Sequence, residues 1–155
     1  MRDQTSLTRL SALHPAARGI FQDFIEECEN TLNITLRIME PVFRTVADQD
    51  ALYAQGRTAP GKIVTNAKGG SSFHNYGLAV DLCHLAGKEI DWNYDMSKLK
   101  PVAAKYGIEW GGDWVTLKDK PHFQKTFGYK WQELFAMFQA KNYDAKGYLH
   151  IKTDK

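Results

Sequence analysis

One short apolar run in the middle of the chain carries a carboxylate, and it constrains the fold more than any other feature. Residues 78–85 read Leu-Ala-Val-Asp-Leu-Cys-His-Leu, a run typical of a buried strand. Because alternate side chains of a strand point to opposite faces, Asp81 shares a face with Ala79 and Cys83, while its chain neighbours pack into the core. An ionised aspartate in such a run is costly without a cation or hydrogen-bond donors. The run therefore predicts a buried strand whose Asp81 has a partner elsewhere in the chain.

Two histidines are the candidate partners. His74 precedes Asp81 by seven residues on a predicted loop, and His122 follows far downstream in Asp-Lys-Pro-His-Phe, residues 119–123. Two histidines and one carboxylate can hold a catalytic zinc ion and leave its fourth position open for water. Asp119 lies three residues before His122 in a proline-containing segment, where it can take a proton from that water. The set predicts a zinc peptidase, with Asp119 as general base.

Three of these four residues also have a simpler interpretation when each is taken alone. Asp81 alone would fit a turn cap at a strand end, His122 a structural histidine, and Asp119 a turn residue before Lys-Pro. None of these explains the four residues together. Cys83 is a competing zinc ligand because it shares the strand face of Asp81, although a lone cysteine is more commonly a small buried thiol.

Composition excludes several classes. The 155 residues fit a single domain, and a net charge of +2 with no basic block does not indicate a nucleic-acid-binding protein. No apolar stretch approaches the roughly 20 residues of a membrane span, so no stable membrane insertion is expected. The first residues lack the apolar core of a secretory signal, which predicts synthesis as a soluble cytoplasmic protein. Cys28 and Cys83 stand in no paired motif and are expected to be reduced.

Periodicity predicts an α+β fold with a small antiparallel sheet that carries the site and is flanked by helices. The expected helices span residues 15–28, 47–55, 96–106 and 131–138. The expected strands span residues 34–39, 78–85, 108–110 and 122–124, with a glycine-rich loop over 59–72. No repeat or linker divides the chain, so residues 1–155 are expected to form one catalytic domain.

Three segments together resemble a known family. The pattern S-x-H-x-x-G-x-A-x-D matches Ser72, His74, Gly77, Ala79 and Asp81. The other two are Leu-Tyr-Ala-Gln-Gly-Arg-Thr at 52–58, preceded by an arginine and a glutamine, and Trp-Gly-Gly-Asp-Trp at 110–114, followed by residues 119–123. Over residues 13–128 the chain resembles the zinc D-alanyl-D-alanine carboxypeptidase and L-alanyl-D-glutamate peptidase family, and within it the phage endolysin branch.

The resemblance implies a hedgehog/DD-peptidase-like fold and a role for each matching residue. His74, Asp81 and His122 are implied as zinc ligands. Asp119 is implied as general base, where much of the family has glutamate. Arg44 is implied to stabilise the charge on the scissile carbonyl oxygen, although the family's glycine-aromatic-arginine segment is replaced here by Glu-Pro-Val-Phe-Arg.

Other residues near the motifs have less specific roles. Arg57 either binds a substrate carboxylate or holds its loop through backbone carbonyls. Ser72 either binds substrate or shapes the loop before the first ligand. Asp113 is expected either to have a structural role or to contact the ligands from behind, and Trp114 is expected to lie at the cleft rim. The other histidines are expected to be structural or surface residues: His14, His84 and His150. The other aromatic residues near the motifs are expected in the core: Trp110, Phe123, Trp131, Phe135 and Phe138.

The implied function is hydrolysis of the L-alanyl-D-glutamate bond in the stem peptides of bacterial peptidoglycan. The resemblance further implies a phage or prophage endolysin, which is expected to be a monomer without a separate wall-binding domain. Such a protein is expected to remain in the host cytoplasm until a holin-type protein permeabilises the membrane. The alternatives are a D-alanyl-D-alanine carboxypeptidase or dipeptidase, and a non-catalytic relative that binds the wall. No calcium loop of the EF-hand type is found, and residues 142–155 either dock on the domain or bind anionic wall polymer.

Overall fold

The computed structural model describes residues 1–155 and confirms the α+β fold. The helices are α1 (Gln4–Arg9), α2 (Pro15–Leu32), α3 (Val46–Ala54), α4 (Lys100–Lys105) and α5 (Trp131–Gln139). The strands are β1 (Thr35–Ile38), β2 (Ala79–Ala86), β3 (Glu89–Asp91), β4 (Glu109–Trp110) and β5 (His122–Gln124). Short 3₁₀ turns are η1 (Leu10–Ala12), η2 (Phe73–Tyr76), η3 (Met96–Leu99) and η4 (Gly111–Asp113).

The strands form one antiparallel sheet in the order β1-β2-β5-β4, with β3 also paired to β2. The predicted strand over residues 78–85 is observed as β2, which pairs directly with β1, β3 and β5. Its second half pairs with β1 and β3, and its first half pairs with β5. In this register Asp81 lies directly opposite His122, so two of the predicted ligands are cross-strand neighbours.

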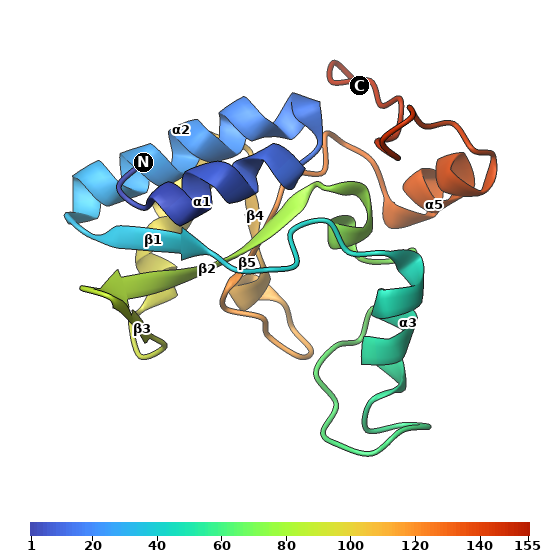
Figure 1. Ribbon diagram of the computed structural model, residues 1–155, viewed down its shortest axis with the longest axis horizontal. Coiled ribbons are helices and arrows are strands. Elements are labelled where there is room, and N and C mark those ends of the chain that lie inside the picture. The colour runs from blue at the N-terminus through green and yellow to red at the C-terminus, as the bar shows by residue number, and fades with distance from the viewer.

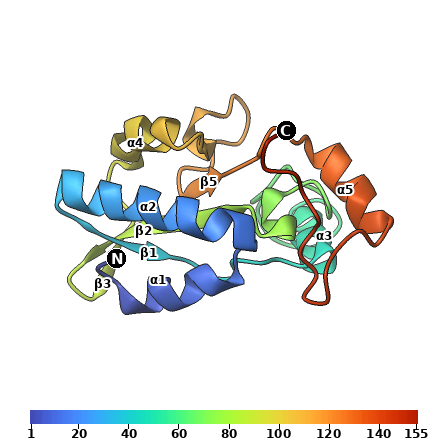
Figure 2. The ribbon, with the colours of Figure 1, turned by 90° about the horizontal axis from the view of Figure 1, so that it is seen from above.

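The core lies between the sheet and α2. On the face of β2 and β5 opposite to Asp81, the side chains of Val80, Leu82 and Phe123 are fully buried. The Phe123 ring packs against Phe24 of α2 with ring centroids 5.4 Å apart. Figure 2 shows α2 lying along the sheet, with α4 on one side of it and α1 on the other. Burial of each such side chain stabilises the fold by about 1.5–3 kcal/mol.

Helix α2 follows from its sequence. Pro15 occupies the first turn, and the His14 side chain caps the helix by accepting a hydrogen bond from the Ala16 N–H. The apolar residues at helical spacing form the buried face: Ala17, Phe21, Phe24, Ile25 and Cys28. The helix ends at Asn33, which adopts the left-handed conformation with φ 51°.

Several short elements were not expected. Helix α1 is capped by the Asp3 side chain, and β3 adds only three residues to the sheet edge. The helix predicted over residues 96–106 is divided into the 3₁₀ turn η3 and the helix α4, which has Pro101 in its first turn. Elements this short carry too few residues for a periodic pattern.

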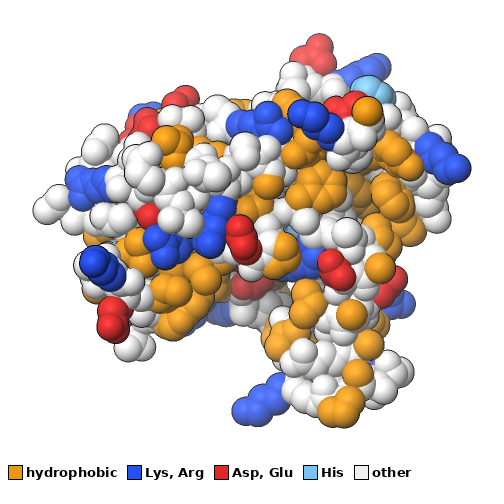
Figure 3. Space-filling model, in the orientation of Figure 1, with side chains coloured by type: hydrophobic (Ala, Val, Ile, Leu, Met, Phe, Trp, Pro, Cys, Tyr) orange, Lys and Arg blue, Asp and Glu red, His pale blue; other side chains and the backbone are white.

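Helices α3 and α5 lie at the same end of the molecule, and α3 with its following loop extends away from the body (Figure 1). Lysine and arginine side chains are spread over the face seen in Figure 3 rather than gathered in one patch. None of the helices is both long and apolar enough to cross a membrane.

Candidate metal centre

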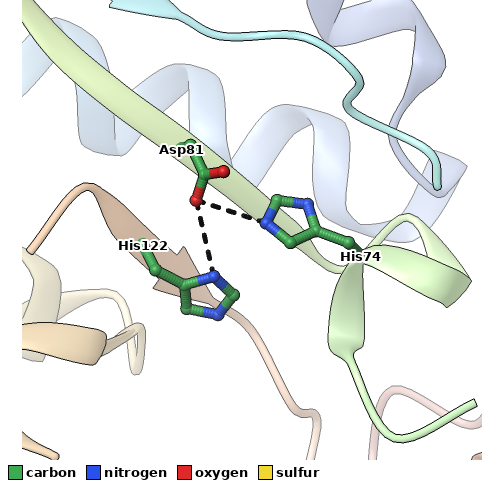
Figure 4. A group of neighbouring side chains, drawn as sticks. All are labelled: His74, Asp81 and His122. Carbon is green, nitrogen blue, oxygen red and sulfur yellow. Dashed lines mark hydrogen bonds and ion pairs between the residues drawn. The ribbon is translucent and has the colours of Figure 1, made fainter. Parts of the chain in front are cut away.

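His74, Asp81 and His122 converge on one point (Figure 4). The Nε2 atom of His74 lies 3.2 Å from Oδ1 of Asp81, and the Nδ1 atom of His122 lies 3.5 Å from the same oxygen. One ligand atom from each of the three residues lies within 4.8 Å of the others. The histidines are buried and Asp81 is partly exposed, so the three residues could hold a metal ion that substrate can reach.

The turn η2 places His74, and the surrounding motif residues explain the turn. Ser72 caps η2 by accepting a hydrogen bond from the His74 N–H. Gly77 ends the turn with φ 68°, a conformation that favours glycine. A Cβ at this position would lie 2.7 Å from the backbone nitrogen of His14. The chain then enters β2, which presents Asp81 to the same space. Ser72 and Gly77 therefore have structural roles in positioning the first ligand.

The outward-facing nitrogens of both histidines have acceptors. His74 Nδ1 lies 3.4 Å from the Val42 carbonyl oxygen, and His122 Nε2 lies 2.8 Å from Oε1 of Gln124. With the ring protons on these outward nitrogens, the nitrogens facing Asp81 keep their lone pairs. Two imidazole nitrogens and a carboxylate oxygen are a donor set that suits zinc and leaves a position open. The residues present therefore fit a catalytic metal.

Electrostatics keep Asp81 ionised. Burial raises the pKa of Asp81, but its contacts with His122 and His74 outweigh burial and hold the pKa well below its usual range. Burial lowers the pKa of His74, which favours the neutral ring that a metal requires. Burial also opposes the charge on His122, but the hydrogen bond and charge of Asp81 raise the pKa of that ring above its ordinary value.

Asp119 lies beside the ligands. Its Oδ2 atom is 3.9 Å from Nδ1 of His122, and its side chain is 43% exposed, which leaves room for water and substrate. The turn η4 makes the approach possible, because a Cβ on Gly111 would lie 2.4 Å from the Asp119 carbonyl oxygen and 3.0 Å from Cβ of His122. Burial, followed by the charge of Asp81, raises the pKa of Asp119, which favours a role in proton transfer.

Arg44 reaches the same site. Its backbone N–H donates to the His74 carbonyl oxygen at 3.0 Å, which ties the segment before α3 to η2. Its Nη2 atom lies 4.0 Å from Oδ2 of Asp81, and Nη1 donates to Oε1 of Gln49 at 2.9 Å. Gln49 is itself held by the Ala67 carbonyl oxygen at 2.8 Å. The unusual residues 40–43 therefore do not prevent Arg44 from pointing toward the ligands.

A cleft of about 940 Å³ opens over the ligands, and Ser72, Arg44 and Asp119 line it. Arg57 does not line it. Its guanidinium instead donates to the carbonyl oxygens of Tyr53 and Thr65 at 2.7 and 3.0 Å and lies over the Tyr53 ring. These contacts correspond to the predicted role of Arg57 in holding its loop. No contact supports its substrate-binding role, which stays a prediction.

Aromatic residues form part of the cleft wall. Trp114 is 36% exposed, and its ring centroid lies 4.9 Å from that of His122, as expected for a rim residue. Trp131 and Phe135 of α5 also line the cleft, although both were expected in the core. Helical spacing reveals which residues share a face of α5, but not that part of this face looks into a cleft.

Other predicted residues lie away from the ligands. Asp113 forms a surface ion pair with Lys100 at 2.9 Å rather than a contact behind the site. The buried Cys83 thiol contacts Met39 and does not belong to the ligand group. Residues 142–155 dock on the domain, where the Leu149 carbonyl oxygen lies 2.7 Å from Nε2 of His14.

Comparisons with known proteins agree with this site. The chain is 44% identical over 125 residues to the peptidoglycan L-alanyl-D-glutamate endopeptidase CwlK of Bacillus subtilis, and the match spans 74% of each protein. It is also 44% identical over 63 residues to the L-alanyl-D-glutamate peptidase of Listeria phage A118, a match to 38% of this chain and 22% of that protein. A sequence model described as D-alanyl-D-alanine carboxypeptidase matches residues 65–125, which contain all three candidate ligands and Asp119.

Solved structures share the fold. The L-Ala D-Glu endopeptidase ChiX of Serratia marcescens superposes with a TM-score of 0.57 at 24% identity, over 80% of this chain and 88% of ChiX. The vancomycin-resistance D,D-dipeptidase VanXYg superposes with a TM-score of 0.52 at 20% identity, over 92% of this chain and 65% of VanXYg. The chain thus belongs to the metallopeptidase family of D-alanyl-D-alanine carboxypeptidases and L-alanyl-D-glutamate peptidases.

Proposed function

We propose that this protein is a zinc-dependent endopeptidase that hydrolyses the L-alanyl-D-glutamate bond in peptidoglycan stem peptides. The observation that carries the proposal is the convergence of His74, Asp81 and His122 beside Asp119 in one cleft. The bond assignment rests on the 44% identity to CwlK over three quarters of both chains. When bound, zinc would supply Lewis acidity to the scissile carbonyl and to the attacking water.

Two side chains beside the proposed ligands have separate roles in the reaction: Asp119 in proton transfer and Arg44 in charge stabilisation. Asp119, 3.9 Å from His122, accepts a proton from the attacking water in this proposal and returns it to the leaving amine. Its raised pKa brings the carboxylate closer to the basicity that proton transfer needs. Arg44 holds a positive charge beside the ligands, where it stabilises negative charge on the carbonyl oxygen as the tetrahedral intermediate forms.

A D-alanyl-D-alanine carboxypeptidase is the second candidate, because the matching family model carries that description. The cleft favours the endopeptidase. At about 940 Å³ it lies at the large end of ligand pockets, which suits a peptide held on both sides of the scissile bond.

The deciding experiment is digestion of purified peptidoglycan, with the products identified by mass and metal content measured in parallel. We expect new L-alanine C-termini and D-glutamate N-termini, from a protein that contains one zinc ion. Free D-alanine as the product would show that the protein is a D-alanyl-D-alanine carboxypeptidase. If a zinc-loaded protein cleaves nothing, the protein would be a non-catalytic relative that binds the wall.

We further propose that the protein acts as a phage or prophage endolysin, held in the host cytoplasm until a holin-type protein permeabilises the membrane. The similarity to the Listeria phage A118 peptidase supports this setting. The longer match to the bacterial CwlK supports a wall-remodelling enzyme of the bacterium instead. Expression with and without a holin separates the two, because lysis without any helper contradicts the endolysin proposal.

A further inference from the structure

The two histidine ligands are held in different ways. The outward nitrogen of His74 faces a backbone carbonyl oxygen, that of Val42, which no substitution removes. The outward nitrogen of His122 faces a side chain instead, Oε1 of Gln124 at 2.8 Å. His122 and Gln124 are two residues apart on β5 and therefore lie on the same face of the sheet.

Gln124 is itself oriented by a third residue. Gln124 lies directly opposite Glu109 in the pairing of β4 with β5, and its Nε2 atom donates to Oε2 of Glu109 at 3.0 Å. An ionised carboxylate only accepts hydrogen bonds, so it draws the NH₂ group of the amide toward itself. The amide oxygen is then left facing His122, and Gln124 is buried, with 8% of the residue exposed, which limits other arrangements.

The direction of the hydrogen bond between Gln124 and His122 determines which ring nitrogen of His122 carries the proton. An oxygen facing Nε2 of His122 requires the ring proton on that nitrogen, which leaves the lone pair on Nδ1, the atom that faces Asp81. A reversed amide would place its NH₂ group against Nε2 and force the proton onto Nδ1. That tautomer cannot bind a metal at Nδ1. The orientation of one amide thus decides whether His122 is a ligand.

We propose that Gln124 and Glu109 are positioning residues that select the metal-binding tautomer of His122. The inference rests on the proposed zinc dependence, and it concerns residues outside the three ligands, Asp119 and Arg44. Partners behind a metal-bound histidine typically change metal affinity by about 10–100-fold when they are removed. The family motif residues of this chain include neither Gln124 nor Glu109.

The test compares zinc affinity, measured by competition with a chelating dye, in wild type and three variants. Gln124→Met keeps the length of the side chain and removes the acceptor, and we expect about 10–100-fold weaker zinc binding. The double variant Gln124→Glu with Glu109→Gln exchanges the amide and the carboxylate, keeps an acceptor for His122, and should bind zinc like the wild type. Glu89→Gln, at an exposed position of β3, is the control for a lost surface charge.

The tautomer of His122 is read directly by two-bond proton–nitrogen NMR correlations, also in the metal-free protein at alkaline pH. We expect the proton on Nε2 in the wild type and in the exchanged variant, and a mixture of tautomers in Gln124→Met. Unchanged zinc affinity and tautomer in Gln124→Met would overturn the proposal. If that variant does not fold, Glu109→Ala decides, because this exposed residue should alter the tautomer without unfolding the protein. A wild type that binds no zinc but has the expected tautomer contradicts only the proposed function.

Discussion

Two aspartates that both face cationic or potentially cationic side chains, Asp3 and Asp81, are stabilised in different ways. Asp3 caps α1, and its two oxygens each accept a hydrogen bond at 2.9 Å from the Arg37 guanidinium, with a further bond from the Ser6 hydroxyl. Asp81 faces two histidines, and its nearest permanent cation, Arg44, is 4.0 Å away. The chain thus supplies a counterion for one carboxylate and leaves the other open to a metal.

The difference separates a structural acid from a functional one. A bidentate pair with arginine is geometrically specific and keeps Asp3 occupied within the fold. Asp81 instead keeps its charge through contacts with His122 and His74, the same side chains that could bind a metal together with it, and not through a close pair with arginine. Substitutions at the two positions should therefore affect different properties, one stability and the other metal binding and activity.

The largest effect is expected for Asp81→Asn. Loss of the carboxylate removes a ligand and the Lewis acidity that depends on it, so kcat/KM should fall on the order of 10³-fold or more. Zinc should be absent from the purified variant by elemental analysis. The metal-free variant should still unfold cooperatively in urea, which separates loss of zinc from loss of the fold. If Asp81→Asn retained zinc and activity, Asp81 would not be a metal ligand and would not differ in function from Asp3.

Asp119→Ala should lower kcat by roughly 10²–10⁴-fold, as expected for the loss of a general base. Unlike the Asp81 variant, it should still bind zinc, which separates proton transfer from metal binding. Asp113→Ala is the matched control, because Asp113 is a surface carboxylate of the same segment paired with Lys100. Equal losses in both variants would indicate a general effect on the loop rather than a role for Asp119.

Asp3→Asn should act on stability alone. Asparagine also caps helices well, so the change chiefly removes the charge that Arg37 meets. The free energy of unfolding should fall by about 1.5–3 kcal/mol at neutral pH, the usual contribution of a hydrogen bond to a charged group. Zinc affinity should not change. Asp23→Asn on the exposed surface of α2 is the control, and an equal effect there would contradict the special role of Asp3.

The smallest effect is the pH dependence of the same pair. The hydrogen bond to Arg37 outweighs burial and lowers the pKa of Asp3 from 3.8 to about 2. A carboxyl group with a lowered pKa stabilises the fold above its unfolded pKa, and this contribution is lost as the pH falls from 3.8 through about 2. Its size is about 2 kcal/mol. Urea unfolding of wild type and Asp3→Asn should therefore converge in acid.

Long periodic segments were predicted well, and short elements were not. The helix that begins at Pro15 and the strand that carries Asp81 have enough residues to display their period, and both are observed as α2 and β2. Helix α1 and strand β3 were missed because six and three residues display almost no period. The cap at Asp3 is a local signal for α1, but its bidentate partner Arg37 lies 34 residues away.

The site likewise contains residues that the sequence indicated and residues that it did not. Residue chemistry and family motifs indicated the three candidate ligands and Asp119, and the structure brings these four residues together. The sequence did not indicate Gln124 or Glu109, because an amide and a carboxylate 15 residues apart match no motif. It also left the role of Arg57 open and assigned Trp131 to the core, whereas Trp131 lines the cleft.

The sequence by itself determined the chemistry of this protein. It contains the donor atoms that a metal needs, the glycine at residue 77 that the turn before β2 requires, and the apolar alternation that buries one face of that strand. Only the tertiary structure decided which atoms meet. The pairing of β2 with β5 sets Asp81 opposite His122, and the pairing of β4 with β5 sets Glu109 opposite Gln124. Strand register is a relation between distant segments, and no local pattern in either segment contains it.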